Sequence, residues 1–269
     1  MTNGRVLLEM TDGVAVLTLN HPETLNAFGL KLRQDMTEAL DRIEAQAGSA
    51  SARCLLITGA GRGFCSGANL NDPDRVPRDR EAEARGEVQS DLQAWYNPTF
   101  LRLRALNIPV VAAVNGIAAG AGMSLALSAD IKIAARSAKF LQAFARIGLV
   151  PDCGASFLLP RLIGVARSLE LSLLAEPLPA ETALAWGMIN RVVDDGALME
   201  EAMTMARRLA AGPASLGMIR KLYWEGLENT YSTQLDLEAR MQSEAGLTAD
   251  HTEGVMAFRE KRPAQFKGR

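Results

Sequence analysis

Histidine and cysteine are scarce in this chain of 269 residues, which has two of the first and three of the second. Neither His21 nor His251 has a second histidine or a cysteine at metal-ligand spacing, so we predict no metal site. The three cysteines form no Cys-x-x-Cys pair and are odd in number, which favours a reducing compartment over a disulfide framework. The sequence also lacks a Gly-x-Ser-x-Gly turn, a P-loop and the Gly-x-Gly-x-x-Gly spacing, which disfavours common hydrolase and nucleotide sites.

An excess of charge of one sign is also missing, because 29 basic residues face 31 acidic ones and leave a formal net charge of −2. This balance gives no electrostatic reason to expect binding to nucleic acid or to an anionic membrane. The opening residues, MTNGRVLLEM, contain no apolar run typical of a secretion signal. The most apolar stretch, residues 108–129, is interrupted by Asn115, Ser124 and three glycines, so we expect a buried strand, a turn and a helix there. We therefore expect a cytoplasmic protein that binds neither membrane nor nucleic acid.

What the sequence does contain is an alternation of apolar strands and amphipathic helices, followed by a mostly helical part. Two apolar runs around Thr11-Asp12-Gly13 predict a hairpin, and apolar residues at helical spacing predict a helix over 30–45. Further buried strands are predicted at 54–58, 109–114 and 131–134. Helical patterns then dominate, at 166–174, 180–186, 197–211, 214–228, 233–245 and 253–261. The charged segment 72–91 predicts a solvated loop or an exposed helix. This order is typical of an α/β core with a helical extension, which we divide into residues 1–200 and 201–269.

Two glycine-rich turns, Gly63–Leu70 and Asn115–Gly122, each follow a predicted buried strand. Small residues let a ligand approach the backbone closely, and the second turn opens onto a helix whose first N–H groups are unpaired. Two N–H groups that converge from different turns would form an oxyanion hole. A second interpretation is that the glycines only permit tight packing of helix against sheet. Spacing alone favours this second interpretation.

One carboxylate, Asp152, follows a proline in the apolar segment GLVPDCGASFLLPRLIG (148–164). It has two interpretations. Asp after Pro is common at helix starts, so the side chain could cap a helix that begins near Gly154. In an apolar pocket the same group would have a raised pKa and could act as a base.

Several segments resemble the enoyl-CoA hydratase/isomerase, or crotonase, superfamily, in the right order and over nearly the whole chain. They are NHPETLNAF, LLITGAGRGFCSGANL, IPVVAAVNGIAAGAGMSLALSADIKIAA, GLVPDCG and EGVMAFREKRPAQF. Within that superfamily the motifs GRGFCSG, AAGAG, WYNP and TQLDLE are most similar to ring-1,2-epoxyphenylacetyl-CoA isomerases of bacterial phenylacetate degradation. The resemblance implies an α/β fold with a crotonase-like ββα spiral core (1–200). It also implies a C-terminal helical region (201–269) that assembles homotrimers or hexamers, dimers of trimers. The substrate would be an acyl-CoA thioester, with no cofactor besides the coenzyme A of that substrate.

The resemblance also implies which residues act. The family's hydratases use two glutamates, and the corresponding positions here are Ser124 and Phe144, so two-acid hydration is disfavoured. The family's isomerases carry a single acid where this chain has Asp152, which we therefore favour as the base. The thioester oxygen would lie between the N–H groups of Ser66 and Ala121.

Other contacts carried over from the resemblance are less specific. Residues expected to bind the acyl part are Ala68, Asn69, Leu70, Gly120, Gly122, Phe144, Trp95 and Tyr96; those expected to bind coenzyme A are Leu25, Phe258 and Lys261. Asn69 also fits a plain turn residue, Trp95 and Tyr96 fit ordinary core positions equally well, and Phe258 and Lys261 fit a solvated helix end. Thr24 stands where many relatives carry a basic residue.

The expected function is isomerisation of ring-1,2-epoxyphenylacetyl-CoA to its oxepin, with one carboxylate and two main-chain amides. One alternative is an enoyl-CoA hydratase or a double-bond isomerase acting on unsaturated acyl-CoA. An alternative of another class is a non-catalytic subunit that binds CoA thioesters.

Overall fold

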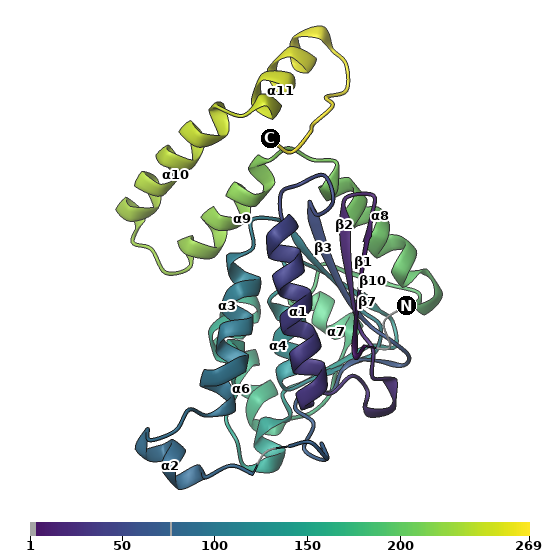
Figure 1. The fold of residues 1–269 in the computed structure, drawn as a ribbon, viewed down its shortest axis with the longest axis vertical. Coiled ribbons are helices and arrows are strands. Elements are labelled where there is room, and N and C mark those ends of the chain that lie inside the picture. Colours follow the sequence, from purple (N-terminus) through teal and green to yellow (C-terminus); the bar gives the residue numbers. More distant parts are fainter. Residues whose placement is uncertain (1–3, 76) are drawn as a thin grey trace.

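The larger of two sheets has six strands in the order β1-β2-β3-β5-β7-β10, seen at the centre of the molecule in Figure 1. This computed structural model describes residues 4–75 and 77–269. The strands are β1 (Val6–Thr11), β2 (Val14–Leu19), β3 (Cys54–Gly59), β5 (Val110–Val114), β7 (Ile131–Ala135) and β10 (Arg191–Val193). From β2 onward neighbouring strands are parallel, and only β1 pairs antiparallel with β2. The predicted hairpin is confirmed: Asp12 and Gly13 take positive φ values of 52° and 75° between the two strands.

A second, smaller sheet repeats the same progression with very short strands. Its order is β4 (Gly63–Cys65), β6 (Ile117–Ala119), β8 (Lys139–Leu141) and β9 (Leu178–Pro179). The chain therefore passes three times from a strand of the large sheet to a strand of the small sheet and then to a helix. The successive units are β3-β4 with α3 (Asn97–Ala105), β5-β6 with α4 (Ala121–Leu127) and β7-β8 with α5 (Ala155–Ile163), and residues 66–96 form an insertion before α3. This is the ββα spiral that the resemblance implied.

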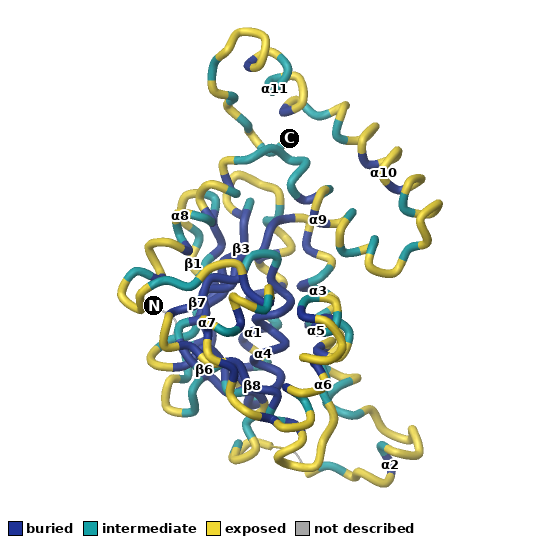
Figure 2. The backbone as a smooth tube through the Cα atoms, turned by 180° about the vertical axis from the view of Figure 1, so that it is seen from behind, coloured by how far each residue is buried: buried dark blue, intermediate teal, exposed yellow. Residues whose placement is uncertain are grey.

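Helices cover the sheets and join the strands. They are α1 (Leu30–Gln46), α2 (Arg80–Arg85), α3 (Asn97–Ala105), α4 (Ala121–Leu127), α5 (Ala155–Ile163), α6 (Val165–Leu174), α7 (Ala180–Ala185) and α8 (Leu198–Ala210). Shorter turns are η1 (Pro22–Thr24), η2 (Leu92–Tyr96), η3 (Ala143–Ile147) and η4 (Asp195–Ala197). The central strands are buried throughout, as the dark tube in Figure 2 shows, and all seven residues of α4 are buried. Strands enclosed on both faces can be continuously apolar, which explains runs such as Cys54–Ile57.

Three further helices, α9 (Ser215–Gly226), α10 (Tyr231–Gly246) and α11 (Ala249–Glu260), form an arm that leaves the core (Figures 1 and 2). The division predicted between residues 200 and 201 falls inside α8. Ala202, Ala206 and Ala210 of that helix belong to the core cluster, and α8 packs against β2, β3, β5 and β7. The part that separates from the core therefore begins with α9, and its role in trimerisation stays a prediction.

Asp130, at the start of β7, joins the arm to the core. Its Oδ2 accepts hydrogen bonds from the Val110 N–H at 2.7 Å and from Arg220 Nε of α9 at 2.8 Å. Its Oδ1 accepts a hydrogen bond from Trp224 Nε1 at 2.8 Å. One carboxylate thus holds a sheet strand and the base of the arm together.

The C-terminal tail folds back along α11 and is fixed by two acids of that helix. Asp250 accepts hydrogen bonds from the N–H groups of Lys267 at 2.6 Å and Gly268 at 2.8 Å. Glu253 accepts one from the Gln265 N–H at 2.8 Å and forms an ion pair with Arg262 at 2.6 Å. Backbone and side-chain contacts of these two acids therefore tie residues 262–269 to the helix.

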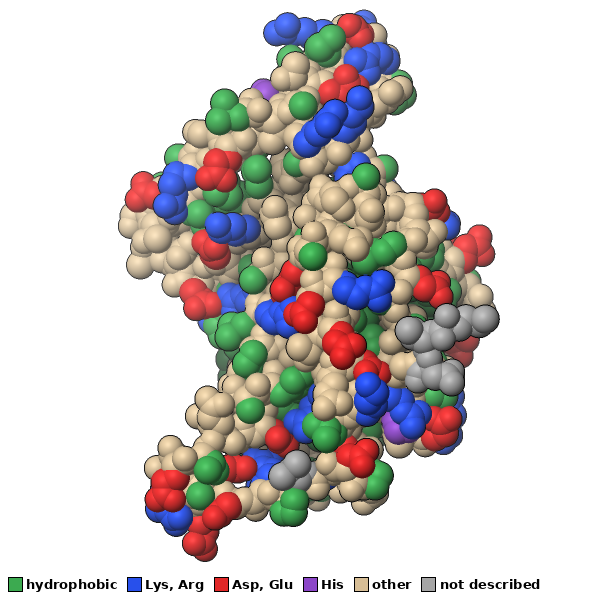
Figure 3. Space-filling model, viewed as in Figure 1, with side chains coloured by type: hydrophobic (Ala, Val, Ile, Leu, Met, Phe, Trp, Pro, Cys, Tyr) green, Lys and Arg blue, Asp and Glu red, His purple; other side chains and the backbone are tan. Residues whose placement is uncertain are grey.

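Acidic and basic side chains are interspersed on the surface. On the face shown in Figure 3, red and blue side chains alternate and neither sign forms a continuous stripe. The predicted charged segment 72–91 contains α2, whose Asp79 accepts a hydrogen bond from the Ala82 N–H at 2.9 Å and so caps the helix. Among the described residues, no helix combines the length and apolar composition that crossing a bilayer requires.

Candidate active site

Two asparagines fix the loop that leads into the first glycine turn. Asn26, fully buried, donates through Nδ2 to the carbonyls of Ala60 at 3.0 Å and Gly63 at 2.8 Å. Asn115 donates through Nδ2 to the carbonyl of Gly61 at 2.9 Å and accepts from the Gly59 N–H at 3.2 Å. Sequence reasoning assigned neither residue this role, because both act on a loop far away in the chain.

The Ser66 N–H, predicted to bind the thioester oxygen, is already used. It donates to the Leu25 carbonyl at 2.9 Å, and the Ser66 hydroxyl donates to the Thr24 carbonyl at 2.8 Å. The prediction for Ser66 is therefore wrong in this structure, since a committed N–H is not free for a ligand. Ser66 instead attaches the glycine turn to the η1 segment.

Ala68 offers the N–H group that Ser66 does not. It forms an isolated parallel bridge with Phe28, in which the Phe28 N–H donates to the Gly67 carbonyl at 2.7 Å and the Asn69 N–H donates to the Phe28 carbonyl at 3.2 Å. In a parallel bridge the central residue directs its own N–H and C=O away from its partner. The Ala68 N–H therefore points away from Phe28, and among the described residues it donates no hydrogen bond.

The second turn places the start of α4 against the first. Gly120 has φ 51° and precedes Ala121, the first helical residue, whose N–H has no acceptor one turn earlier. Gly67, with φ 93°, lies so close that a Cβ on it would be 3.6 Å from the Ala121 nitrogen. A Cβ on Gly122 would collide with the Cys65 carbonyl. These contacts place the turn that carries Ala68 directly against the start of α4, where the Ala121 N–H lies.

Asp152 lies in the loop between η3 and α5 and does not cap α5. The helix begins at Ala155 with Gly154, at φ 81°, in the cap position and with no side-chain cap. The capping interpretation of Asp152 is therefore wrong. Its Oδ1 is buried and makes no hydrogen bond within the described residues. Burial raises the pKa of the Asp152 carboxyl, and a hydrogen bond with Cys153 opposes that rise in part.

Ser124 and Phe144, which stand where two-acid hydratases have glutamates, have defined positions. Ser124 Oγ donates to the main-chain oxygen of Asp152 at 3.2 Å and lies within 3.3 Å of the Gly120 carbonyl. Since Ser124 follows Ala121 by about one helical turn, it places the Asp152 loop about 5 Å along the helix from the Ala121 N–H. The Phe144 ring is 3.8 Å from where a Gly120 Cβ would be. The site therefore holds one carboxylate beside an apolar ring.

The two cysteines near this site are not nucleophiles. Burial raises the pKa of Cys65 to about 12 and raises that of Cys153 further, with the Asp152 charge adding to it. Both thiols are therefore protonated at neutral pH, and only a thiolate attacks or binds metal effectively.

Three aromatic residues form a cluster beside the first turn. Trp95 and Tyr96 meet edge to face with ring centroids 4.7 Å apart, and Phe28 lies 5.4 Å from Trp95 and 5.9 Å from Tyr96. Trp95 Nε1 donates to the Arg33 carbonyl at 3.1 Å and to Thr37 Oγ1 at 3.0 Å, so its polar edge faces α1. Tyr96 is only 6 % exposed.

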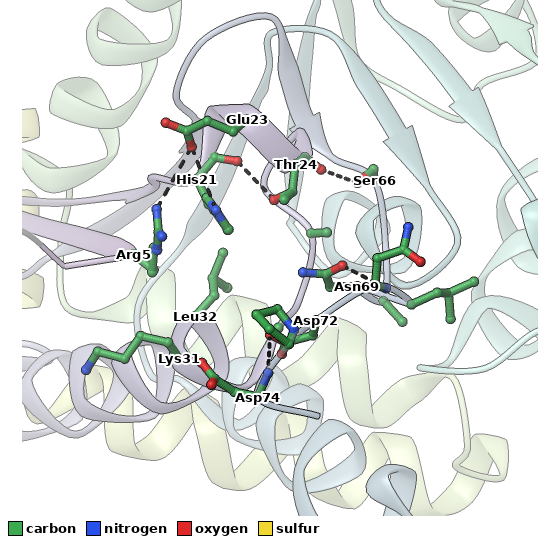
Figure 4. Close-up of a pocket in the computed structure, with 16 residues that line it drawn as sticks. Arg5, His21, Glu23, Thr24, Lys31, Leu32, Ser66, Asn69, Asp72 and Asp74 are labelled. Carbon is green, nitrogen blue, oxygen red and sulfur yellow. Dashed lines mark hydrogen bonds and ion pairs between the residues drawn. The ribbon is translucent and has the colours of Figure 1, made fainter. Parts of the chain in front are cut away.

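An open cavity of about 650 Å³ lies against the first turn (Figure 4). Its walls include Ser66, Ala68, Asn69 and Leu70, together with Thr24 and the charged residues Arg5, Glu23, Lys31, Asp72 and Asp74. Figure 4 shows Ser66 joined to Thr24, and Arg5 and His21 directed toward Glu23. Asn69 Oδ1 accepts from the Asn71 N–H at 3.1 Å, so it has the turn role that was left open, and it also lines the cavity.

The predicted coenzyme A residues are not brought together in one chain. The Leu25 carbonyl holds Ser66, and its neighbour Thr24 lines the cavity. Phe258 is 86 % exposed on α11, and Lys261 ends that helix with φ 55°. Figure 1 shows α11 at the far end of the arm, whereas the cavity adjoins the opposite end of α1. Within the described ranges no cluster of three or more His, Cys, Asp and Glu side chains could hold a metal ion.

Enzymes that form an enolate and return its proton combine a base with main-chain N–H donors, and the Asp152 carboxylate and the N–H groups of Ala68 and Ala121 are candidates for these roles. The sequence model of the family described as Enoyl-CoA hydratase/isomerase matches residues 9–269, so the chain belongs to that family and the predicted resemblance and fold class are confirmed.

Individual relatives agree with this assignment. The chain is 47 % identical over 265 residues, 98 % of both chains, to 1,2-epoxyphenylacetyl-CoA isomerase of Escherichia coli K12. It is 43 % identical over 270 residues, covering both chains fully, to a Rhodobacter capsulatus protein described as a probable enoyl-CoA hydratase. A crystal structure of enoyl-CoA hydratase from Bacillus anthracis matches with a TM-score of 0.88 at 29 % identity, over 98 % of this chain and all of that one. The chain is therefore an enzyme of this family.

Proposed function

We propose that this enzyme isomerises ring-1,2-epoxyphenylacetyl-CoA to the corresponding oxepin-CoA, with Asp152 as the only acid–base group. The observation that carries the proposal is the Asp152 carboxylate: one oxygen is buried without a partner, and Ser124 fixes its loop beside the N–H of Ala121. A base needs a free oxygen and a pKa raised toward neutral pH, and Asp152 has both attributes.

The reaction is a proton transfer within one substrate molecule. Asp152 takes a proton from the carbon next to the thioester carbonyl, and the electrons of that C–H bond form the enolate. The N–H groups of Ala68 and Ala121 bind the enolate oxygen. The bond between the two carbons shared by the six-membered and three-membered rings breaks, while both C–O bonds remain, and a seven-membered ring results. Asp152 then returns its proton to a ring carbon as the carbonyl re-forms, so nothing is gained or lost overall.

The cavity of Figure 4 provides the place for coenzyme A in this proposal. Ala68 lies in its wall and also supplies an oxyanion N–H, so a thioester held there would have its chain in the cavity. Thr24 supplies no charge, and the basic residues of the cavity, Arg5 and Lys31, would bind the phosphates in exchange for their present partners Glu23 and Asp35. Phe258 and Lys261 could contact coenzyme A only from a neighbouring subunit, as in a homotrimer or a dimer of trimers. The proposed reaction takes place in the cytoplasm and uses no cofactor besides the coenzyme A of the substrate.

Two other activities use parts of the same site. Moving a double bond in an unsaturated acyl-CoA requires the same single base, and a relative named trans-2-decenoyl-[acyl-carrier-protein] isomerase from Streptococcus mutans is 33 % identical over 98 % of both chains. Hydration would need Asp152 alone to activate water, since Ser124 and Phe144 cannot. A subunit that only binds thioesters has no use for an unpartnered buried carboxylate.

Turnover of enzymatically generated phenylacetyl-CoA epoxide by the wild-type protein and by Asp152→Asn tests the proposal. We expect product from the wild type only, with the variant still binding phenylacetyl-CoA with a similar Kd. Incubation with crotonyl-CoA and with a β,γ-unsaturated acyl-CoA, followed by ultraviolet absorbance, separates hydration from double-bond isomerisation. No conversion of the epoxide by the wild type would refute the proposed substrate.

A further inference from the structure

Tyr96 has a hydroxyl group with no role in the fold. The residue is 6 % exposed, yet its oxygen makes no hydrogen bond with any described residue. It is also not one of the fully enclosed atoms without a partner, which belong to Arg33, Gln142 and Asp152 in the described chain. A buried phenol usually finds a hydrogen-bond partner. An oxygen that is neither bonded nor enclosed opens onto space beside the protein.

Two sets of contacts indicate where that space is. The Tyr96 ring stands edge to face on Phe28, at an interplanar angle of 88°, and Phe28 forms the bridge with Ala68. On the other side, Tyr96 lies within electrostatic reach of the Asp152 loop. Burial raises the pKa of Tyr96, the Arg33 charge opposes the rise, and the Asp152 carboxylate adds to it. Tyr96 therefore packs on the residue that bridges Ala68 and lies near enough to the Asp152 loop to sense its charge.

Local backbone structure and neighbours set Tyr96 apart from Trp95. The turn η2 is a single π-helical turn, a form that often occurs at functional sites. Trp95 uses its only donor on Arg33 and Thr37 of α1, whereas Tyr96 keeps its donor free. Because burial keeps the phenol protonated at neutral pH, Tyr96 donates a hydrogen bond and does not compete with Asp152 as a base.

We propose that the Tyr96 hydroxyl donates a hydrogen bond to an oxygen atom carried on the acyl group, and so makes the site selective for oxygenated rings. This inference rests on the proposed function and adds a determinant of specificity to it. No bond to Tyr96 forms or breaks during the reaction. A weakly acidic phenol holds the ring oxygen without protonating it, so both C–O bonds survive while the C–C bond opens. Without such an oxygen, the hydroxyl has nothing to contribute to proton removal.

Two substrates that differ only in the ring oxygen test the inference with the variant Tyr96→Phe. The first is the epoxide of phenylacetyl-CoA, followed as oxepin formation. The second is phenylacetyl-CoA in D₂O, in which exchange of the protons next to the thioester is followed by mass spectrometry. We expect kcat/KM for the epoxide to fall about 10–100-fold, the range for loss of one hydrogen bond to a polar substrate group. We expect the exchange rate of phenylacetyl-CoA to stay within about twofold, since it uses Asp152 and the two N–H groups only.

Tyr231→Phe is the matched control, because it removes the same hydroxyl from a residue that is 81 % exposed. It should change neither rate. Equal losses on both substrates with Tyr96→Phe, or no loss on the epoxide, would overturn the inference while leaving the proposed function intact. Exchange of phenylacetyl-CoA by a wild-type protein that does not convert the epoxide would overturn the proposed substrate, and this inference with it. Thermal unfolding is the check that Tyr96→Phe is folded. We expect a Tm close to that of the wild type, because the ring contacts remain.

Discussion

Ser124 Oγ donates to the main-chain oxygen of Asp152 at 3.2 Å, and this bond joins the helix that begins with Ala121 to the loop that carries the proposed base. Ser124 stands where two-acid enzymes have a catalytic glutamate. Here it holds the loop of the proposed base, Asp152, in place. Ser124 is fully buried, so water does not replace the bond when the side chain is absent.

Replacing Ser124 by alanine should lower kcat about tenfold and change KM little. One buried hydrogen bond contributes about 1 kcal/mol, and small displacements of a base reduce rates strongly. Ser128→Ala is the matched control, because Ser128 Oγ donates to the Ser124 and Leu125 carbonyls of the same helix and not to the Asp152 loop. Steady-state kinetics with thermal unfolding makes the comparison. Equal kcat values for the two variants would show that Ser124 does not position Asp152.

Asp152→Asn should abolish turnover and also stabilise the fold at neutral pH. The raised pKa means that the folded protein binds the Asp152 proton more tightly than the unfolded chain does. Wild-type stability should therefore fall as the pH rises from about 4 through the folded pKa, and the loss should be complete above it. The variant lacks this loss, so its Tm should exceed that of the wild type at pH 7.5. A lower Tm at pH 7.5, or identical pH profiles, would contradict the assigned burial of this charge.

Backbone esters distinguish Ala68 from Ser66 as the first oxyanion donor. Replacing residue 68 by lactic acid removes its N–H and keeps the side chain, and glyceric acid does the same at residue 66. The ester at 68 should lower kcat about 100–1000-fold, as loss of an oxyanion donor does elsewhere. The ester at 66 removes the bond to Leu25 and should cost about 1 kcal/mol in the free energy of unfolding, with kcat largely kept. The reverse pattern in single-turnover rates would restore the prediction made for Ser66.

Glu253→Gln should loosen residues 262–265 of the C-terminal tail at neutral pH. Arg262 first, and then the Gln265 N–H, lower the pKa of Glu253 to about 2. Its stabilising contribution is present above the unfolded value of about 4.3 and is lost as the pH falls from there toward 2. Protection of the Gln265 amide from hydrogen–deuterium exchange, relative to its intrinsic rate at each pH, should therefore be lost in the variant at pH 7 and in the wild type only at acid pH, while Asp250 still holds the Lys267 and Gly268 amides. Glu260→Gln, which removes the other partner of Arg262 but no contact to the tail backbone, should exchange like the wild type.

Elements with long, regular patterns could be predicted from the sequence, whereas the small sheet could not. Apolar residues recur at helical spacing over several turns of α1, and two apolar runs flank the turn of the hairpin. The predicted limits of both elements lie within a residue or two of the structure. The strands β4, β6 and β8 have three residues each, too few for an alternating pattern. The start of α4 was predicted two residues late, because Gly122 was treated as a helix breaker although contact with Cys65 requires it to be glycine.

The chemistry of the site was predictable in kind but not in detail. A single acid in an apolar segment indicated Asp152, but the sequence fitted a helix cap equally. The structure excludes the cap, because Gly154 occupies that position. The Ser66 N–H donates to the Leu25 carbonyl, and the Ser124 hydroxyl donates to the Asp152 carbonyl. Contacts between segments far apart in the chain leave no local pattern in the sequence.

The absence of space between Gly122 and the Cys65 carbonyl divides the site into an invariant part and an adaptable part. The proposed donors at Ala68 and Ala121 cannot be shifted without separating β4 from α4. A related protein that keeps this packing therefore keeps the proposed binding site for the thioester oxygen. The proposed base lies on a separate loop, which accepts a hydrogen bond from the Ser124 hydroxyl of α4. New reactions could therefore arise by moving an acid from one loop to another while the thioester stays where it is.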